Sequence, residues 1–341
     1  MFARQCAAPL LVSLWFACEA YAEEKVRSFP LAEIKPGVVI AAASLAEGKA
    51  AMTQRDEFIA ALSDFDRQAR MRSVDRVTEV QFLEFLAGQV LPWDHSERSV
   101  LRTTCQSLSQ RLSEFDVPLP DKVLLVKTTG AEEGCYCYCR GDNAIMIPRR
   151  IVESQRSSLE RLILRQLFHI SLRHRPEMRD QLYALVGFVP CAPLRLPSHM
   201  QCRRVTHPDT PCIRHCLPIQ SFGRQCYVTP LLVTSVEKFS PQVGRMSRYV
   251  DFRLLPIDVV SGSRDQAPEF MESFFLDAEA VPEFFDRTTM NTMNVSHPEQ
   301  ILADNFVHLV RGTKRLNAPE LVYQLRAYYQ RSSQPMLATK Q

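Results

Sequence analysis

Apolar residues recur at helical spacing in several parts of the chain. From about Ala51 to Phe115, runs such as TEVQFLEFLAGQVL and SERSVLRTTCQSLSQRLSEF place apolar residues three or four positions apart, as an amphipathic helix requires. Ser96 is the expected N-cap of the second run. The same spacing predicts four more helices, at about 157–174, 176–187, 298–311 and 319–330.

Shorter apolar runs bounded by turn residues predict strands. Lys122 to Thr129 is one, and CYCYCRGDNAIMIP is a hairpin that turns near 141–143. CYVTPLLVTSV and RYVDFRLLPIDVV are two more, whereas the Cys- and Pro-rich segment from Phe188 to Pro218 is expected to be an irregular loop. Helices, strands, a helix, strands and helices in this order predict an α+β fold, with helices around a small mixed sheet.

The first residues, MFARQCAAPLLVSLWFACEAYAEE, have the features of a secretory signal peptide spanning 1–22. Arg4 is the positive start, an apolar run follows, and Ala20 and Ala22 are the small residues at the cleavage site. Cys18 raises a lipoprotein alternative, but Trp15 stands where a lipobox prefers Leu or Val. The apolar run is too short to span a bilayer, so we expect an exported, periplasmic or secreted protein with no transmembrane span.

The rest of the chain is expected to form one domain. An N-terminal extension at 23–50 precedes a single domain at 51–331, whose helical N-terminal part reaches about residue 120, and 332–341 is a tail. The net charge is only +3 and no concentrated basic stripe is present, which excludes a nucleic-acid partner.

Export changes the interpretation of the cysteines. The chain has 11, and nine remain after the signal peptide is removed, so several should form disulfides and at least one should not. Cys135, Cys137 and Cys139 alternate along a predicted strand and would share one face about 7 Å apart, so a disulfide would join one of them to a distant cysteine such as Cys105.

Two metal-binding alternatives involve the cysteines and are less favoured than disulfides. The three alternating cysteines are the first. A zinc site in the Cys-rich segment is the second, although its spacing is not typical of zinc ligands. Its candidate residues are Cys202, His207, Cys212, His215 and Cys216.

The stretch LILRQLFHISLRH carries the pattern closest to a catalytic motif. Arg165, Gln166 and His169 occupy the positions of the two histidines and the glutamate in H-E-x-x-H, where residues four apart share a helix face and bind one zinc ion. Gln166 has no carboxylate with which to accept a proton from water, and the permanent charge of Arg165 repels a metal ion.

Several separated segments resemble the secreted bacterial metallopeptidases of the zincin-like, gluzincin type. LLVKTTGAEEG and CRGDNAIMIP resemble the strand and edge hairpin before the metal helix, and LERLILRQLFHISLRHRPEMRDQLYALVGF resembles the metal helix and its successor. RRVTHPDTP resembles a segment that usually reads T-N-P-D, and HPEQILADNFVHLV resembles the helix that carries the glutamate ligand. The resemblance covers about residues 60 to 312 and implies a zincin-like scaffold.

The resemblance implies that the metal site is degenerate. The first histidine ligand falls on Arg165 and the catalytic glutamate on Gln166, whereas the second histidine is retained as His169. The glutamate ligand falls on Gln300, and the carboxylate that orients the site is retained as Asp304. Two of three ligands and the general base are therefore replaced, and no metal cofactor is expected.

A buried arginine needs an acidic partner, because an unpaired buried charge costs several kcal/mol. We therefore predict that Arg165 pairs with Asp304, or with Glu299, and links the two helices in place of a metal ion. Glu299 would point about 100° away from Gln300 on its helix. The alternative is an Arg165 exposed at the rim of a cleft.

These observations predict an exported pseudopeptidase that acts by binding a peptide, or an envelope or extracellular protein. A peptide could add to an edge strand, for which Asn143 to Ile147 is the candidate. The enzyme alternative is a hydrolase or peptidase with a rearranged zinc site made of His169, Asp304 and His308. A third hypothesis makes the Cys-rich segment the interaction surface of an envelope protein.

Overall fold

The structure is a computed structural model that describes residues 27–154, 156–194, 196, 198–221, 224–236, 238–243, 248–257, 275–277 and 281–331. The expected signal peptide at 1–22 and tail at 332–341 lie outside the described residues. Within the described residues, no helix combines the length and the apolar composition needed to cross a membrane.

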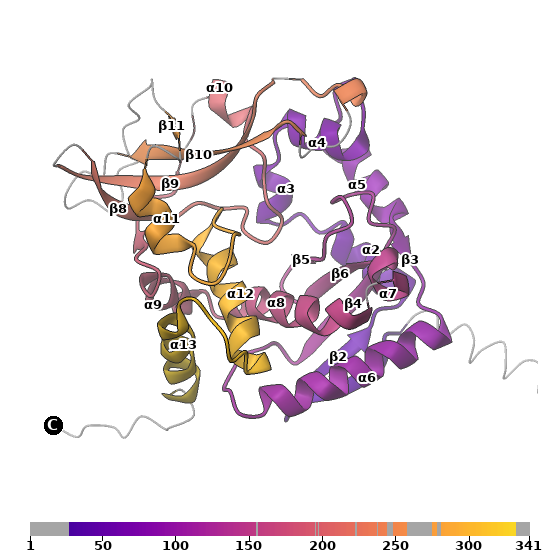
Figure 1. Ribbon diagram of the computed structural model, residues 1–341. Coiled ribbons are helices and arrows are strands. Elements are labelled where there is room, and N and C mark those ends of the chain that lie inside the picture. Colours follow the sequence, from indigo (N-terminus) through magenta and orange to yellow (C-terminus); the bar gives the residue numbers. More distant parts are fainter. Residues whose placement is uncertain are drawn as a thin grey trace, which may run out of the picture.

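The fold is α+β, as the order of predicted elements indicated, and the described residues form two sheets (Figure 1). The main sheet is mixed, with the order β1-β2-β4-β6-β5, and β3 also pairs with β4. Strands β2, β4 and β6 run parallel, whereas β1 and β5 are antiparallel to their neighbours. The strands are β1 (Phe29–Lys35), β2 (Val38–Ala42), β3 (Val90–Leu91), β4 (Lys122–Thr128), β5 (Tyr138–Arg140) and β6 (Ala144–Pro148).

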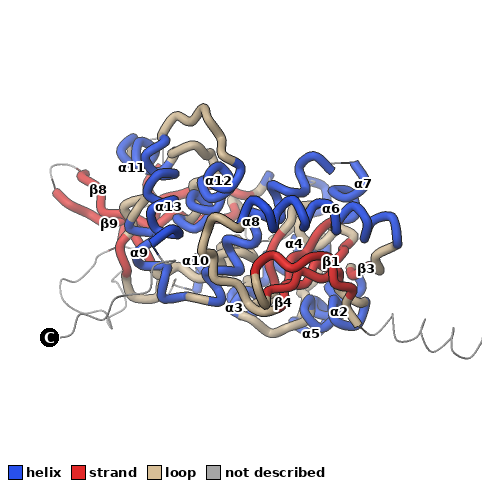
Figure 2. Tube along the Cα trace, turned by 90° about the horizontal axis from the view of Figure 1, so that it is seen from below, coloured by secondary structure: helices blue, strands red, loops and turns tan. Residues whose placement is uncertain are grey.

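Helices cover both faces of this sheet (Figure 2). Along β4, Val123 and Leu125 belong to the cluster under α6 and α8, whereas Leu124 and Val126 belong to the cluster under the N-terminal helices. This alternation follows from the two-residue period of a strand and explains why β4 is apolar almost throughout. The helices concerned are α2 (Leu45–Met52), α3 (Glu57–Ala61), α4 (Asp64–Met71), α5 (Glu79–Gly88), α6 (His95–Leu112), α7 (Arg149–Ser154) and α8 (Arg156–His174).

The N-terminal segment differs from the prediction. Residues 29–42, expected to lie in an extension, form the β1–β2 hairpin, and β2 pairs in parallel with β4. The segment reads FPLAEIK and VVIAA around Gly37, whose φ of 80° permits the tight turn. The hairpin thus belongs to the main core. The cap of α6 also differs from the prediction, because Asp94 rather than Ser96 is the N-cap and forms a capping box with Glu97.

The second sheet is antiparallel, with the order β11-β10-β9-β8-β7, and lies on the other side of α12 from the main sheet (Figure 1). The predicted strands CYVTPLLVTSV and RYVDFRLLPIDVV correspond to β9 and β10, the last three residues of the latter lying outside the described residues. The segment at 188–218, predicted to be irregular, instead contains β7, α10 and the start of β8. Bounds are β7 (Val189–Pro190), α10 (Ser198–Gln201), β8 (His215–Ser221), β9 (Arg224–Thr234), β10 (Val250–Ile257) and β11 (Leu276–Asp277).

The remaining helices agree closely with the periodic pattern. The helix predicted at 176–187 is a short 3-10 turn followed by α9 (Arg179–Ala184). A seven-residue helix that was not predicted, α11 (Pro282–Thr288), precedes α12 (Pro298–Arg311), and α13 (Pro319–Arg331) ends the described chain. Helices α8 and α12 pack against each other in the centre of the molecule (Figure 1), which brings Arg165 of α8 to Gln300 and Asp304 of α12.

Candidate functional site

The α8–α12 interface combines an apolar part with a polar part. Phe168 of α8 stacks on Phe306 of α12 with ring centroids 5.4 Å apart, and both are fully buried. Arg165 and His169, one turn apart on α8, form the polar part together with residues from the first two turns of α12. The apolar contacts therefore fix the distance at which the polar side chains meet.

Arg165 pairs with Asp304, as predicted. Its Nε donates to Asp304 Oδ1 at 2.9 Å, and its Nη2 donates to Gln300 Oε1. The Arg165 side chain is only 11% exposed, so it does not lie free at a rim. The guanidinium thus links α8 and α12 through Asp304 and Gln300, the two α12 positions that the resemblance singled out.

Residues before α12 hold the partners of Arg165 in place. Thr292 Oγ1 donates to the second oxygen of Asp304 at 2.6 Å, and Asn294 Nδ2 donates to Gln300 Oε1 at 3.3 Å. The Nε2 of Gln300 lies 3.3 Å from His207 Nδ1. Each side chain that meets the guanidinium is therefore oriented by a further hydrogen bond.

His169 is bound to Glu299 and not to either partner of Arg165. Its Nδ1 lies 2.7 Å from Glu299 Oε1, and the other oxygen of Glu299 accepts a hydrogen bond from Tyr183. Burial alone would raise the pKa of Glu299, but the hydrogen bond from His169 and the nearby charges of His169 and Arg179 lower that pKa to about 2. Glu299 is therefore ionised at neutral pH.

The segment before β8 contributes Asp209, which the sequence analysis did not single out. Its Oδ2 lies 3.7 Å from His169 Nε2 and 3.9 Å from Arg165 Nη1. Both Asp209 Oδ2 and His169 Nε2 are buried without a hydrogen-bond partner. Burial opposes ionisation of Asp209, but the charges of His169, His207 and Arg165 together hold its pKa below the ordinary value.

The edge strand differs from the one predicted. Asn143 to Ile147 was expected at the edge, but β6 is paired on both sides, with β4 and with β5. The edge is β5, Tyr138–Arg140, and all three residues are buried. The prediction failed because the second strand of the hairpin, β6, pairs with β4 and leaves the first strand, β5, at the edge.

Backbone groups of β5 and of the residues that flank it, Cys137 and Gly141, are already bonded within the molecule. Cys139 N donates to Asp209 Oδ1 at 2.7 Å, and the carbonyl of Cys137 accepts from Gln166 Nε2 at 3.2 Å. Arg173 donates to the carbonyls of Gly141 and Pro208 at 2.6 and 2.9 Å. A peptide could add to this edge only by displacing these contacts.

Gln166, where the resemblance expects a catalytic glutamate, is hydrogen-bonded at both ends of its amide. Besides its bond to Cys137, its Oε1 accepts from the Cys139 thiol at 3.0 Å. The side chain is fully buried. The amide nitrogen of Gln166 is thus bonded to Cys137, just before β5, and its amide oxygen to Cys139 in β5.

The rearranged metal site is not assembled. Asp304 is bonded to Arg165, whereas His308 lies one turn further on and places Nδ1 3.2 Å from Thr313 Oγ1. Across the described ranges no three His, Cys, Asp or Glu side chains form a group that could hold a metal ion, which covers the proposed Cys-rich zinc set as well. With a guanidinium and an amide in two positions, the residues present do not fit zinc.

The cysteines are not arranged as predicted. Among the described residues no two cysteines lie at disulfide distance. Cys135 is not in a strand with Cys137 and Cys139, because it adopts a left-handed φ of 68° in the turn after Gly134. Burial raises the pKa of Cys105 and Cys137 to about 12, so both are thiols at neutral pH.

Asp209 and Tyr183 belong to the site but were not predicted from the sequence, and His207 was predicted only as a possible zinc ligand. A signal existed for two of them, since His207 and Asp209 lie in RRVTHPDTP, one of the segments that carried the resemblance. Tyr183 had no distinguishing signal in the sequence. No protein-family model matches the chain, and neither the curated proteins nor the solved structures gave a match.

Proposed function

We propose that this chain is an exported pseudopeptidase: a zincin-like scaffold without metal-dependent hydrolysis that acts by binding a peptide or a protein. The observation that carries the proposal is the contact of Arg165 with Asp304 and Gln300, which puts a fixed positive charge between the two helices. A mixed sheet with an antiparallel edge strand against α8 also supports a zincin-like scaffold.

Peptide hydrolysis at this interface lacks two requirements. A general base must reach a water molecule, but Gln166, where the resemblance expects that base, has no carboxylate and is bonded to Cys137 and Cys139. The carboxylates of Asp209 and Glu299 are buried. A cation would have to polarise the scissile carbonyl, and the Arg165 guanidinium between the two helices is already bonded to Asp304 and Gln300.

Binding through added strand pairing at β5 is disfavoured by its internal bonds, so we place the contact surface at the rim. Tyr136 is 76% exposed and precedes Cys137, whose carbonyl bonds Gln166. Met293 is 86% exposed and lies between Thr292 and Asn294, which orient Asp304 and Gln300. Single exposed apolar residues are common, so the position of these two beside the site is what supports the proposal.

Metal analysis tests the loss of hydrolysis. We expect wild-type protein purified without a tag to contain no stoichiometric zinc and to leave an unfolded protein substrate intact. The triple variant Arg165→His, Gln166→Glu, Gln300→Glu restores the ligand set and should bind about one zinc ion per chain. Arg161→His, which adds a histidine to an exposed position of the same helix, is the control and should bind none. Stoichiometric zinc and chelator-sensitive proteolysis in the wild type would overturn the proposal.

Peptide selection tests the binding role. Displayed random peptides should be enriched on the wild-type protein, and the double variant Tyr136→Ser, Met293→Ser should lose most of that enrichment. Val80→Ser is the matched control, because Val80 is 58% exposed on α5, away from the site. Equal enrichment on the double variant and the control would show that peptides do not bind at Tyr136 and Met293.

A further inference from the structure

Two cysteines lie side by side where the short strand β7 pairs with β8. Val189 of β7 is opposite Cys216 of β8, and the pairing continues past β7, because Cys191 N donates to the carbonyl of Arg214 at 2.9 Å. Residues two apart on a strand share a face, so Cys191 lies on the face of Val189, diagonally beside Cys216. The two thiols are hydrogen-bonded to each other and are not joined as a disulfide in this structure.

The surroundings of the two sulfur atoms differ. Cys216 is fully buried in an apolar cluster with Leu231 and Leu255, whereas Cys191 packs against this cluster and is only partly buried. The hydrogen bond from Cys216 lowers the pKa of the Cys191 thiol against the effect of burial, and the same contact together with burial raises the pKa of Cys216. Cys191 is therefore the more accessible thiol and the one that more readily forms a thiolate, which is the nucleophilic form.

Strand β7 is a short edge of the second sheet. It has two residues, both exposed, and the second, Pro190, has no N–H with which to donate to β8. After Cys191 the chain meets the segment before β8 once more, where Leu194 N donates to the carbonyl of Ile213 at 3.1 Å. A covalent bond between Cys191 and Cys216 would therefore strengthen a short pairing.

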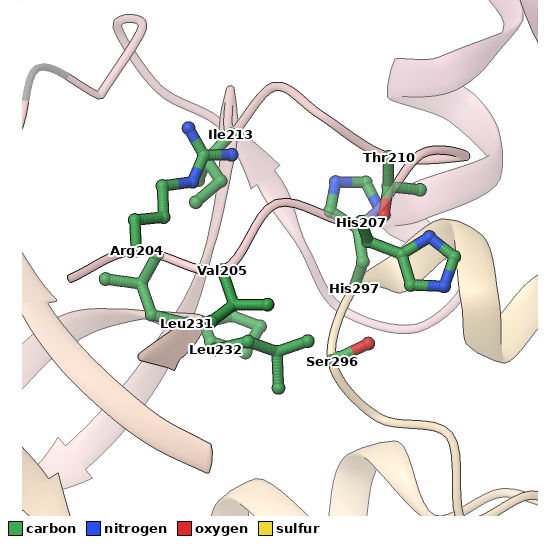
Figure 3. Close-up of a pocket in the computed structure, with 10 residues that line it drawn as sticks. Arg204, Val205, His207, Thr210, Ile213, Leu231, Leu232, Ser296 and His297 are labelled. Atoms are coloured by element: carbon green, nitrogen blue, oxygen red, sulfur yellow. The ribbon is translucent and has the colours of Figure 1, made fainter. Parts of the chain in front are cut away.

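The segment between the two cysteines brings His207 and Asp209 to the Arg165 site. Figure 3 shows its middle part, in which His207 lines a small cavity together with His297, the N-cap of α12. Asp209 Oδ2 lies 3.9 Å from Arg165 Nη1. A disulfide at the ends of the segment would restrict the unfolded chain and so favour the folded state in which these contacts exist.

We propose that Cys191 and Cys216 form a dithiol site that a disulfide reagent of the glutathione class oxidises to an intramolecular disulfide. The Cys191 thiolate attacks one sulfur of the reagent, whose S–S bond breaks, and the other half leaves as a thiolate that takes up the Cys191 proton. Cys216 then gives up its proton, attacks the Cys191 sulfur of the mixed disulfide and releases the second half of the reagent as a thiol. Two protein thiols are thus oxidised while one reagent disulfide is reduced to two thiols. The proposal does not depend on whether the chain is a pseudopeptidase.

Oxidised glutathione tests the proposal on the folded wild-type protein. The reduced protein is incubated with oxidised glutathione without denaturant, the remaining thiols are blocked, and the peptides are mapped by mass spectrometry. We expect the peptide that contains Cys191 to be linked to the peptide that contains Cys216, and the oxidised protein to melt about 5 °C above the reduced protein. A linkage between other cysteines in place of this one, no linkage, or an unchanged melting temperature overturns the proposal.

Variants test the order of the two steps. In Cys216→Ala the mixed disulfide has no thiol to resolve it, so glutathione should stay bound to Cys191 and the rise in melting temperature should be lost. Cys191→Ser should leave Cys216 unmodified and should also lose the rise, so one variant suffices if the other does not fold. Cys212→Ser is the matched control, because Cys212 lies in the same segment and is partly buried, but its thiol is bonded to Glu57. Glutathione on Cys216 in Cys191→Ser, or loss of the linkage in Cys212→Ser, overturns the assignment.

Discussion

Two arginines of this molecule are buried among acids, and their surroundings differ. Arg70 of α4 donates to Asp66 Oδ1 at 2.6 Å, to Glu133 and to the carbonyl of Thr206, and its side chain is 1% exposed. Arg165 of α8 is 11% exposed and meets Asp304 and the neutral Gln300. A single segment, from Thr206 to Asp209, contacts both.

The two arginine networks differ in whether all of their buried polar atoms have a hydrogen-bond partner. None of the polar atoms of Arg70, Asp66 and Glu133 is a buried group without a partner. Beside Arg165, by contrast, His169 Nε2 and Asp209 Oδ2 face each other at 3.7 Å, and neither has a hydrogen-bond partner. A network that serves only stability is expected to be complete, whereas incomplete satisfaction is typical of sites shaped for another purpose. The comparison therefore indicates that the Arg70 network stabilises the fold, whereas the network around Arg165 is incomplete.

The largest loss of stability is expected when the network of Arg70, Asp66 and Glu133 is broken. Arg70→Met leaves Asp66 and Glu133 buried without their counter-charge, which should lower the free energy of unfolding by about 4 kcal/mol. Denaturant unfolding measures the change. Arg76→Met is the control: Arg76 is 81% exposed and its pair with Asp64 spans 3.6 Å, so its loss should be under about 0.5 kcal/mol. A loss below about 1 kcal/mol for Arg70→Met would contradict its structural role.

A somewhat smaller loss of stability, which depends on pH, is expected when Glu299 is replaced. The pKa of Glu299 is lowered from 4.5 to about 2, so its ionised form stabilises the folded state by about 3 kcal/mol above pH 4.5. That contribution is lost as the pH falls from about 4.5 through 2. Glu299→Gln should therefore lower the free energy of unfolding by about 3 kcal/mol at pH 7, and the difference from wild type should shrink toward pH 2. A difference independent of pH would show that packing, and not charge, is responsible.

Arg165→Met should cost less than either change. Asp304 is 21% exposed and keeps its bond to Thr292, so solvent and the hydroxyl compensate for part of the lost pair. We expect a loss of about 1 to 2 kcal/mol in the free energy of unfolding. Adding Asp304→Asn should restore part of it, because the unpaired charge is removed. If Arg165→Met is as destabilising as Arg70→Met, the contrast between the two networks fails.

The periodic parts of the fold could be predicted, because local sequence determines them. The helix predicted at 298–311 is α12, and the helix predicted at 157–174 differs from α8 by one residue. The pair of Arg165 with Asp304 followed from the same periodicity combined with the resemblance. Strands β1 and β2 were missed as part of the domain because their partner in the sheet, β4, is about 80 residues away in the sequence.

The part of the site that could not be predicted lies in the irregular segment before β8, which contains Asp209. Asp209 reaches His169 because Arg173 binds the carbonyl of Pro208 and Asp66 binds the backbone N of Thr206. These contacts join segments far apart in the sequence, and no periodicity indicates them. The role of Glu299 was missed for a related reason: its position away from Gln300 on the helix is what allows it to meet His169, one turn further along α8.

The smallest effect is expected at His308, and it separates the pseudopeptidase from the rearranged hydrolase. His308 contacts Thr313 near the end of α12 and has no bond to the Arg165 site. His308→Ala should therefore change the free energy of unfolding by less than about 0.5 kcal/mol. It should also leave the melting temperature in excess zinc equal to that without zinc, as in the wild type. If instead zinc raised the melting temperature of the wild type and His308→Ala abolished that increase, His308 would be a ligand, and the incomplete network beside Arg165 would be a metal site that accepts its ion only after rearrangement.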